Sequence, residues 1–182
     1  RSAPGATSSR GRGATIAAVR VDKPVVLRVL LPAKVDELLV GRTIERVVRR
    51  AHFVRFALRG APPLELVVSP MLAGRFTLGP AEAKAPRDTA MTFVLGDGRA
   101  LRYRDDVQMG KVYVLTKDDL ASVPGAAEIG VDVLDPAAFT LDAFVALAKT
   151  RRDQAKVFLM DKSALDAMGN AYADEVLFAA GI

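Results

Sequence analysis

Apolar and polar positions alternate through residues 14–116, and many of the apolar positions are β-branched. Alternation with a period of two is typical of strands that bury one face. It predicts strands at residues 15–21, 43–50, 52–58, 64–69, 72–78, 91–95, 100–104 and 111–115. A short helix is expected at 32–40, and Gly96-Asp97-Gly98 predicts a hairpin turn. A series of short strands without crossover helices predicts an antiparallel β-sandwich or flattened barrel.

The alternation stops after Thr116, and helical patterns follow an irregular stretch that contains proline and glycine. Thr140 is expected to cap a helix at 141–149, and a shorter helix is expected at 154–160. A third helix is expected at 170–180, with Asn170 as its N-cap and Gly181 at its end. The predicted fold class is therefore α+β, with the β-sandwich first and the helical region second.

Four segments follow from these patterns. Residues 1–13 are small, polar and basic, which predicts a disordered arm. The β-sandwich domain is expected at 14–116, a linker at 117–139, and a helical domain at 140–182. Residues 80–88 are expected to form a loop within the β domain.

The segment 162–169 joins the last two predicted helices through a double turn. Gly169 would allow another group to approach the backbone closely. The free N–H groups of the following helix would point outward there, which makes an anion or phosphate site.

Charge and composition narrow the classes of function. The formal charge of +5 agrees with a polyanionic partner without requiring one. The sequence has no cysteine and one histidine, which excludes disulfides, thiolate zinc sites and histidine-rich metal sites, so we expect no metal in this chain. No apolar run reaches membrane-spanning length and no signal peptide is apparent, so we expect a cytoplasmic protein, associated with a bacterial nucleoid, that does not contact a membrane.

The sequence KVFLMDKSALDAMGNAYADEVLFAAGI, residues 156–182, resembles the helix-two-turns-helix motif of the formamidopyrimidine-DNA glycosylase and endonuclease VIII family. The family pattern runs roughly I-K-x-x-L-L-D-Q-x-x-x-A-G-I-G-N-x-Y-A-D-E-I-L-F-x-A-G-I. The matching residues are Lys156, Leu159, Asp161, Gly169, Asn170, Tyr172, Ala173, Asp174, Glu175, Leu177, Phe178, Ala180, Gly181 and Ile182. Matches at so many fixed spacings make this a specific signal.

The β half carries further similarity to the same family. Gly74-Arg75-Phe76 is similar to the end of its H-L-G-M-S-G-R-F segment. Its pattern D-G-x-x-L-x-Y-x-D-x-R-x-F-G is followed by Asp97, Gly98, Leu101, Tyr103, Asp105 and Gly110. The resemblance extends from about residue 16 to residue 182.

The resemblance implies that Lys156 and Asn170 hold phosphates that flank a damaged nucleotide, with Gly169 beside them. The family's phosphate-binding lysine in the β half is replaced by His52, which could still bind a phosphate or transfer a proton. The alternative is that Asn170 only caps a helix, Lys156 is a solvated charge and His52 is a half-buried strand histidine.

The resemblance also implies a wedge of side chains that fills the gap left by a flipped base. Leu72, or Met71 if the loop slips by one residue, aligns with the family's methionine. The family's arginine and phenylalanine align with Val107 and Met109, so the arginine that would pair with the orphaned base is missing. Apolar side chains can still wedge into a duplex. The alternative is that Leu72 and Met109 are plain core residues.

The family's catalytic residues, an N-terminal proline and the adjacent glutamate, have no counterpart here, so we expect no catalytic residue in this chain. The sequence starts without methionine and stops in a helical region, so we expect a fragment that lacks the N-terminal catalytic helix and the C-terminal part. Zinc would belong to a finger that follows Ile182, and the chain itself needs no cofactor.

The leading hypothesis is a fragment of a base-excision repair enzyme, a bifunctional DNA glycosylase and apurinic-site lyase that removes oxidised bases. The alternative is a non-catalytic protein that binds damaged or structured DNA on the same scaffold. A third class is a protein-interaction module, whose binding would ignore salt and DNA length. For the first two, we expect a monomer that binds double-stranded DNA with a damaged or abasic site.

Overall fold

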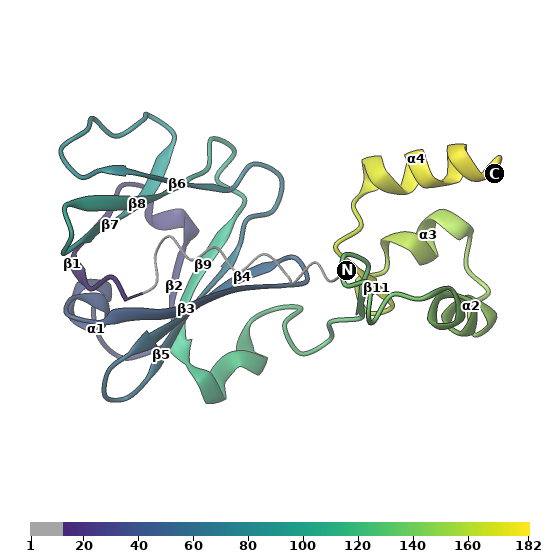
Figure 1. Cartoon of the computed structure of the whole chain (residues 1–182), viewed down its shortest axis with the longest axis horizontal. Coiled ribbons are helices and arrows are strands. Elements are labelled where there is room, and N and C mark those ends of the chain that lie inside the picture. The colour runs from purple at the N-terminus through teal and green to yellow at the C-terminus, as the bar shows by residue number, and fades with distance from the viewer. Residues whose placement is uncertain (1–12) are drawn as a thin grey trace. The chain divides into compact units, whose positions relative to one another are not determined.

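The computed structural model describes residues 13–182, so the predicted disordered arm at 1–13 lies outside the described residues except for Gly13. The chain forms two compact units, Arg1–Leu120 and Ala121–Ile182. The first unit contains the strands β1 to β9, and the second contains the helices α2, α3 and α4 (Figure 1). Each unit is described by itself below.

Two sheets make up the first unit (Figure 1). The five-stranded sheet has the order β2 (Leu27–Val29), β9 (Lys111–Thr116), β5 (Leu64–Ser69), β4 (Phe53–Arg59) and β3 (Thr43–Arg50). The four-stranded sheet has the order β1 (Ile16–Val21), β7 (Thr89–Leu95), β8 (Arg99–Arg104) and β6 (Arg75–Pro80). The predicted hairpin at Gly96-Asp97-Gly98 is confirmed, since it joins β7 to β8.

The apolar faces of the two sheets contribute to one core. Phe56 on β4 packs edge-on against Phe76 on β6, with ring centroids 5.3 Å apart, and therefore links one sheet to the other. Phe76 in turn lies 5.3 Å from the ring of Tyr103 on β8. Burial of such large rings contributes strongly to core stability. The predicted α+β class with a β-sandwich is confirmed.

Several predicted details of this unit are wrong. The sheet is not wholly antiparallel, because β2 pairs in parallel with β9; a strand of three residues is too short to show alternation. The expected helix at 32–40 is the single turn α1 (Val35–Leu39), and the 3₁₀ turn η2 (Pro24–Val26) was not expected. The strand expected at 72–78 starts only at Arg75 and continues to Pro80.

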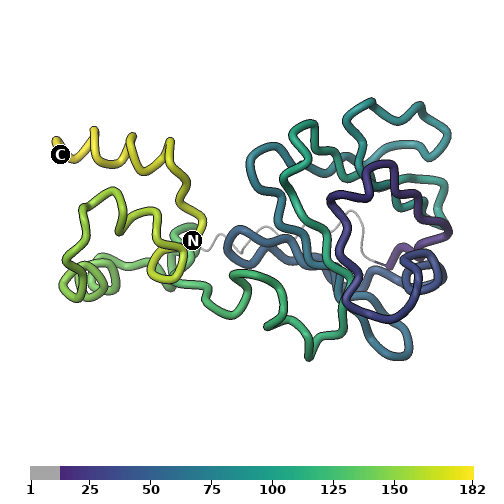
Figure 2. Tube along the Cα trace, turned by 180° about the vertical axis from the view of Figure 1, so that it is seen from behind, coloured from purple at the N-terminus to yellow at the C-terminus, as the bar shows by residue number. Residues whose placement is uncertain are grey.

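The second unit contains three helices and a small parallel β pair. The helices are α2 (Leu141–Lys149), α3 (Ala155–Met160) and α4 (Asn170–Ala180), and the strands are β10 (Val131–Asp132) and β11 (Leu165–Asp166). Figure 2 traces them in green to yellow, with short non-helical segments between the helices. Phe158, Leu159, Leu165 and Ala173 form the buried centre of this unit.

The expected linker at 117–139 is less irregular than predicted. It contains the 3₁₀ helix η3 (Lys117–Ser122) and the strand β10. Likewise the segment 162–169 is not only a double turn, because its residues 165–166 form β11. Both β10 and β11 have two residues, which is too few for a periodic signal in the sequence.

The helix ends test the predicted caps. Thr140 caps α2 as expected, since its Oγ1 accepts a hydrogen bond of 3.2 Å from the Ala143 N–H. Gly181 ends α4 in the left-handed region, also as expected. The prediction of Asn170 as N-cap is wrong, because Gly169 has the extended backbone of the cap and Asn170 is already the first helical residue. Within residues 13–182, the structure shows no helix long and apolar enough to cross a membrane.

Asp88 ties together three parts of the four-stranded sheet. Its Oδ1 accepts a hydrogen bond of 2.9 Å from Arg104 Nε on β8, and it also forms an ion pair with Arg75 on β6. Its backbone oxygen accepts a 2.9 Å bond from the Asp105 N–H. The hydrogen bond from Arg104 and the charges of both arginines lower the pKa of the Asp88 carboxyl.

We expect Asp88→Asn to lower the melting temperature at pH 7, because the neutral amide loses both charged partners. A carboxyl whose pKa is lowered on folding stabilises the protein above its unfolded pKa, and this stabilisation is lost as pH falls through the folded value. Thermal melts of both proteins between pH 2 and pH 7 should therefore converge at the acidic end. A difference in melting temperature that stays constant across this range would contradict the assignment.

Candidate functional site

Three connections leave the same end of the five-stranded sheet. β3 and β4 meet at the turn of residues 51 and 52, since Arg50 pairs with Phe53. Ser69 at the end of β5 pairs with Lys111 at the start of β9, so the loop 70–74 leaves beside the point where the loop 105–110 arrives. The register of the strands therefore brings together three segments that lie far apart in the sequence.

Tyr103 forms a shared base for the two loops. The side chain is fully buried, and a β-carbon added to Gly74 or to Gly110 would overlap its hydroxyl. Both glycines are thus needed for close approach to this one oxygen. Among the described residues the hydroxyl has no hydrogen-bond partner, and burial together with the nearby Asp105 charge raises the pKa of Tyr103.

Asp105 fixes the course of the loop 105–110. Its buried carboxylate accepts hydrogen bonds of 2.8 Å from the Gln108 N–H and 2.8 Å from the Gly110 N–H. Gln108 lies at φ 60, in the left-handed region, inside this turn. Lys23 Nζ donates to the Asp105 backbone oxygen at 3.2 Å and so attaches the residues before β2 to the same turn. Asp105 therefore holds this turn in place.

An apolar rim projects from these two loops. It consists of Met71, Leu72, Val107 and Met109, all of which are exposed. Leu72 is the most exposed at 81%, so the alternative that Leu72 and Met109 belong to the core is wrong. Met71 lies at φ 50, a conformation that is strained for a non-glycine residue and often found at functional sites.

His52 lies at the turn between β3 and β4, at the same end of the sheet as the rim. It is half-buried, and its ring centroid lies 4.0 Å from that of Phe53. Ala51 before it lies at φ 54, and its backbone oxygen accepts a 2.7 Å bond from Arg49 Nη1. The structure therefore places His52 and the candidate wedge residues at one end of one unit.

The arginines of β3 and β4 form a less positive surface than their number predicts. Arg55 forms an ion pair of 2.6 Å with Glu65, and Arg59 forms one of 3.1 Å with Glu45. The carboxylates of Glu45 and Glu65 therefore offset part of the positive charge of these strands.

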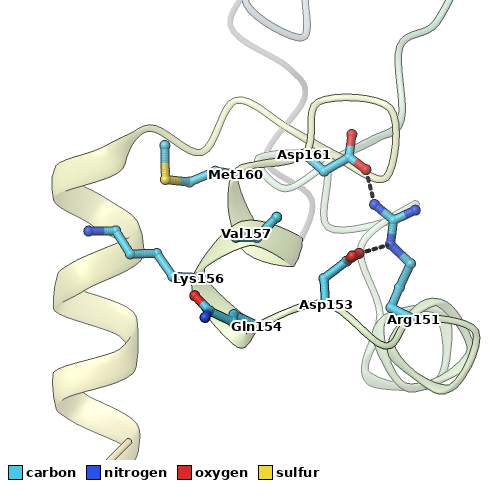
Figure 3. A pocket seen from close by; sticks show the side chains of 7 residues that line it. All are labelled: Arg151, Asp153, Gln154, Lys156, Val157, Met160 and Asp161. Atoms are coloured by element: carbon cyan, nitrogen blue, oxygen red, sulfur yellow. Dashed lines mark hydrogen bonds and ion pairs between the residues drawn. The ribbon is translucent and has the colours of Figure 1, made fainter.

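The second unit holds the other candidate residues. Lys156 on α3 forms an ion pair with Asp174 on α4, with Nζ and Oδ1 2.6 Å apart. Asp174 lies four residues after Asn170, and positions four apart share one face of a helix. The ion pair therefore holds the Lys156 ammonium beside the face of α4 that carries Asn170. In Figure 3 the Lys156 side chain extends toward this helix.

Gly169 stands at the open start of α4. A β-carbon there would meet no atom within 4 Å, so packing within the described protein does not require glycine. The first N–H groups of an α-helix lack partners within the helix, and their dipoles favour an anion. The start of α4 thus offers free N–H donors, and the Lys156 ammonium lies beside a later turn of the same helix.

An open pocket of about 640 Å³ lies beside Lys156 (Figure 3). Arg151 forms ion pairs there with Asp153, at 3.2 Å, and with Asp161. The guanidinium also lies 5.9 Å from the centroid of the Phe158 ring. Two carboxylates of the pocket are thus already engaged by Arg151.

The described residues offer no metal centre. Among residues 13–182, no three His, Asp or Glu side chains gather closely enough to hold a metal ion, and the sequence has no cysteine.

Sequence reasoning missed two features of the site. It quoted Tyr103, Asp105 and Gly110 as parts of one motif but not the contact of both loops with the Tyr103 hydroxyl. It named Asp174 only as a match to the helix-two-turns-helix motif and not as the partner of Lys156. Both features are contacts through space between distant positions, although the glycines of the motif could have indicated a close approach.

Comparison with known proteins adds to this geometry. A family model, the formamidopyrimidine-DNA glycosylase N-terminal domain, matches residues 6–112. The formamidopyrimidine-DNA glycosylase of Moorella thermoacetica is 35% identical over 167 residues, which cover 92% of this chain and 60% of that protein. The protein of the same name from Brevibacillus brevis is 35% identical, over 80% of this chain and 51% of that protein. The chain therefore spans 51–60% of the length of these two relatives.

Solved structures show the same fold. A complex between the Lactococcus lactis Fpg and DNA that contains an abasic site has a TM-score of 0.79 and 21% sequence identity, and the match covers 95% of this chain and 62% of that one. Another Lactococcus lactis structure, with an inhibitor and THF-DNA, has a TM-score of 0.81 at the same identity. At this identity the likeness supports the fold alone.

We expect Gly110→Ala to destabilise the first unit by about 1–3 kcal/mol, because its methyl group would overlap the Tyr103 hydroxyl. Tyr103→Phe alone should change stability little, since it removes a buried hydroxyl without a partner. The double variant should recover part of the loss. Urea unfolding of the four proteins measures this coupling, and additive losses would show that the hydroxyl is not the obstacle.

Proposed function

Because the chain belongs to the formamidopyrimidine-DNA glycosylase family, we propose that it binds duplex DNA at a damaged or abasic site, in base-excision repair. The observation that carries this proposal is the position of Lys156 beside the face of α4 that carries Asn170. Its ammonium and the free N–H groups of α4 would hold a backbone phosphate next to the damaged nucleotide. Gly169 supports this role, because nothing in the described protein occupies the space beside it.

The apolar rim of the first unit would act on the base stack. Met71, Leu72 and Met109 are exposed. The two loops that carry them are held in place by the hydrogen bonds of Asp105 and by packing against Tyr103. Apolar side chains inserted between bases unstack them and kink the duplex, and unstacking costs a few kcal/mol per step. A flipped nucleotide leaves a gap that such side chains would fill. His52, at the same end of the sheet, would contact a nearby phosphate.

For the whole protein we propose the activity of a bifunctional glycosylase and apurinic-site lyase that removes oxidised bases. A secondary amine would attack the sugar C1′, the bond from C1′ to the base would break, and opening of the sugar ring would give a Schiff base, with a neighbouring glutamate as proton carrier. The 182-residue sequence contains no Pro-Glu pair, so the residues named above would bind and position DNA and not react with it. The second candidate function is a non-catalytic DNA-binding protein. It is favoured by Val107, which stands where the family has the arginine of its wedge.

Borohydride trapping separates these two functions. The protein in its full natural length would be incubated with a duplex that contains an abasic or 8-oxoguanine site, and borohydride would reduce any Schiff base to a stable adduct. A covalent adduct supports the glycosylase and lyase. Salt-sensitive binding without an adduct supports the non-catalytic protein.

We expect Lys156→Ala to weaken binding to an abasic-site duplex by about tenfold, because one charged phosphate contact is lost. The slope of log affinity against log salt should become shallower by about one unit. Fluorescence anisotropy at several salt concentrations measures both quantities.

Lys84→Ala is the matched control, since it removes the same charge from the exposed loop that follows β6. Its salt slope should equal that of the unaltered chain. If Lys156→Ala and Lys84→Ala behave alike, Lys156 does not contact phosphate. Binding that ignores salt in all three proteins would reject the DNA-binding function and favour a protein-interaction module.

A further inference from the structure

We propose that Asp174 is an internal competitor for the DNA phosphate at Lys156. In the free protein the Asp174 carboxylate binds the Lys156 ammonium, with Nζ and Oδ1 2.6 Å apart. A phosphate that binds this ammonium would have to displace the carboxylate. This proposal rests on the function proposed above and adds a residue that sets the affinity of the same site.

The surroundings of Lys156 leave Asp174 as its carboxylate partner. The two other carboxylates of the adjacent pocket, Asp153 and Asp161, form ion pairs with Arg151. Asp161 is held further by bonds of 2.9 Å from the Ser163 N–H and 2.6 Å from Ser163 Oγ. Asp153 and Asp161 therefore do not bind the lysine, and the Asp174 carboxylate does.

Two effects of Asp174 oppose each other. The ion pair holds a flexible lysine side chain in one place, which would favour phosphate binding by reducing the entropy lost. The carboxylate also repels an arriving phosphate and must give up its own interaction first. The side chains of Lys156 and Asp174 are 41% and 52% exposed, so their pair is solvated and reduces the entropy of the lysine side chain only a little. A phosphate that binds the ammonium must still displace the carboxylate. The competition should therefore outweigh the ordering.

The carboxylate would also reduce binding to undamaged DNA. A phosphate contact carries no sequence information and contributes to every site on a duplex. A competitor at this contact lowers the affinity for all sites alike and leaves discrimination to the groups that sense the lesion. The apolar rim is such a group, because it acts only where the stack can open.

The test compares Asp174→Asn with Glu175→Gln in the full 182-residue chain. Both variants remove one negative charge from neighbouring positions of α4, but Glu175 has no ion pair with any residue the structure describes. We expect Asp174→Asn to bind both an undamaged and an abasic-site duplex ~2- to 5-fold more tightly than Glu175→Gln does, as expected for release of one exposed ion pair. The salt slope should stay unchanged, because the number of contacted phosphates is the same.

The double variant Lys156→Ala/Asp174→Asn completes the cycle. The gain in affinity from Asp174→Asn should disappear in the Lys156→Ala background, since no ammonium remains for the carboxylate and the phosphate to compete for. A gain of equal size in that background would mean that Asp174 acts only through general repulsion. Weaker DNA binding by Asp174→Asn would mean that the Asp174 carboxylate orders the lysine. Either result overturns the proposal.

The same measurements separate this proposal from the function on which it rests. If Lys156→Ala leaves both affinity and salt slope unchanged, the phosphate site itself is rejected. If Lys156→Ala weakens binding but Asp174→Asn equals Glu175→Gln, the site stands and only the role of Asp174 is rejected.

Discussion

The burial of Tyr103 is the constraint on which the rest of the first unit depends. Its ring continues the aromatic contacts of Phe56 and Phe76, which join the two sheets, and its hydroxyl lies against Gly74 and Gly110. The packing between the sheets therefore determines where two surface loops can run. The position of the exposed apolar rim therefore depends on the packing of Tyr103 in the core.

The sequence predicts most of this fold, because its signals are local. Alternation finds the long strands, and the side-chain oxygen of Thr140 identifies the start of a helix. The errors arise where a local signal is too short or continues too far. β2 has three residues, and the apolar Leu72 extends the pattern of β6 backward into a loop that Gly74 and Pro70 close with a backbone hydrogen bond of 2.8 Å.

The candidate site was predicted only in part, for a related reason. Fixed spacings within one motif identify Lys156 and Asn170, but spacing contains no information about a partner on another helix. Asp174 is visible in the sequence as an acidic residue in a helix, where interaction with the dipole is the obvious role. The cross-strand carboxylates Glu45 and Glu65 were missed similarly, because pairing across a sheet depends on register and not on distance along the chain.

The exposed rim has a consequence for redox chemistry. Met71 and Met109 present thioethers to solvent, where an oxidant can convert them to sulfoxides. A sulfoxide is polar and chiral, so oxidation would replace the apolar surface of these side chains with one that prefers water. The proposed engagement of DNA by these side chains would then weaken under the same oxidative conditions that damage bases, unless a reductase restores the thioethers.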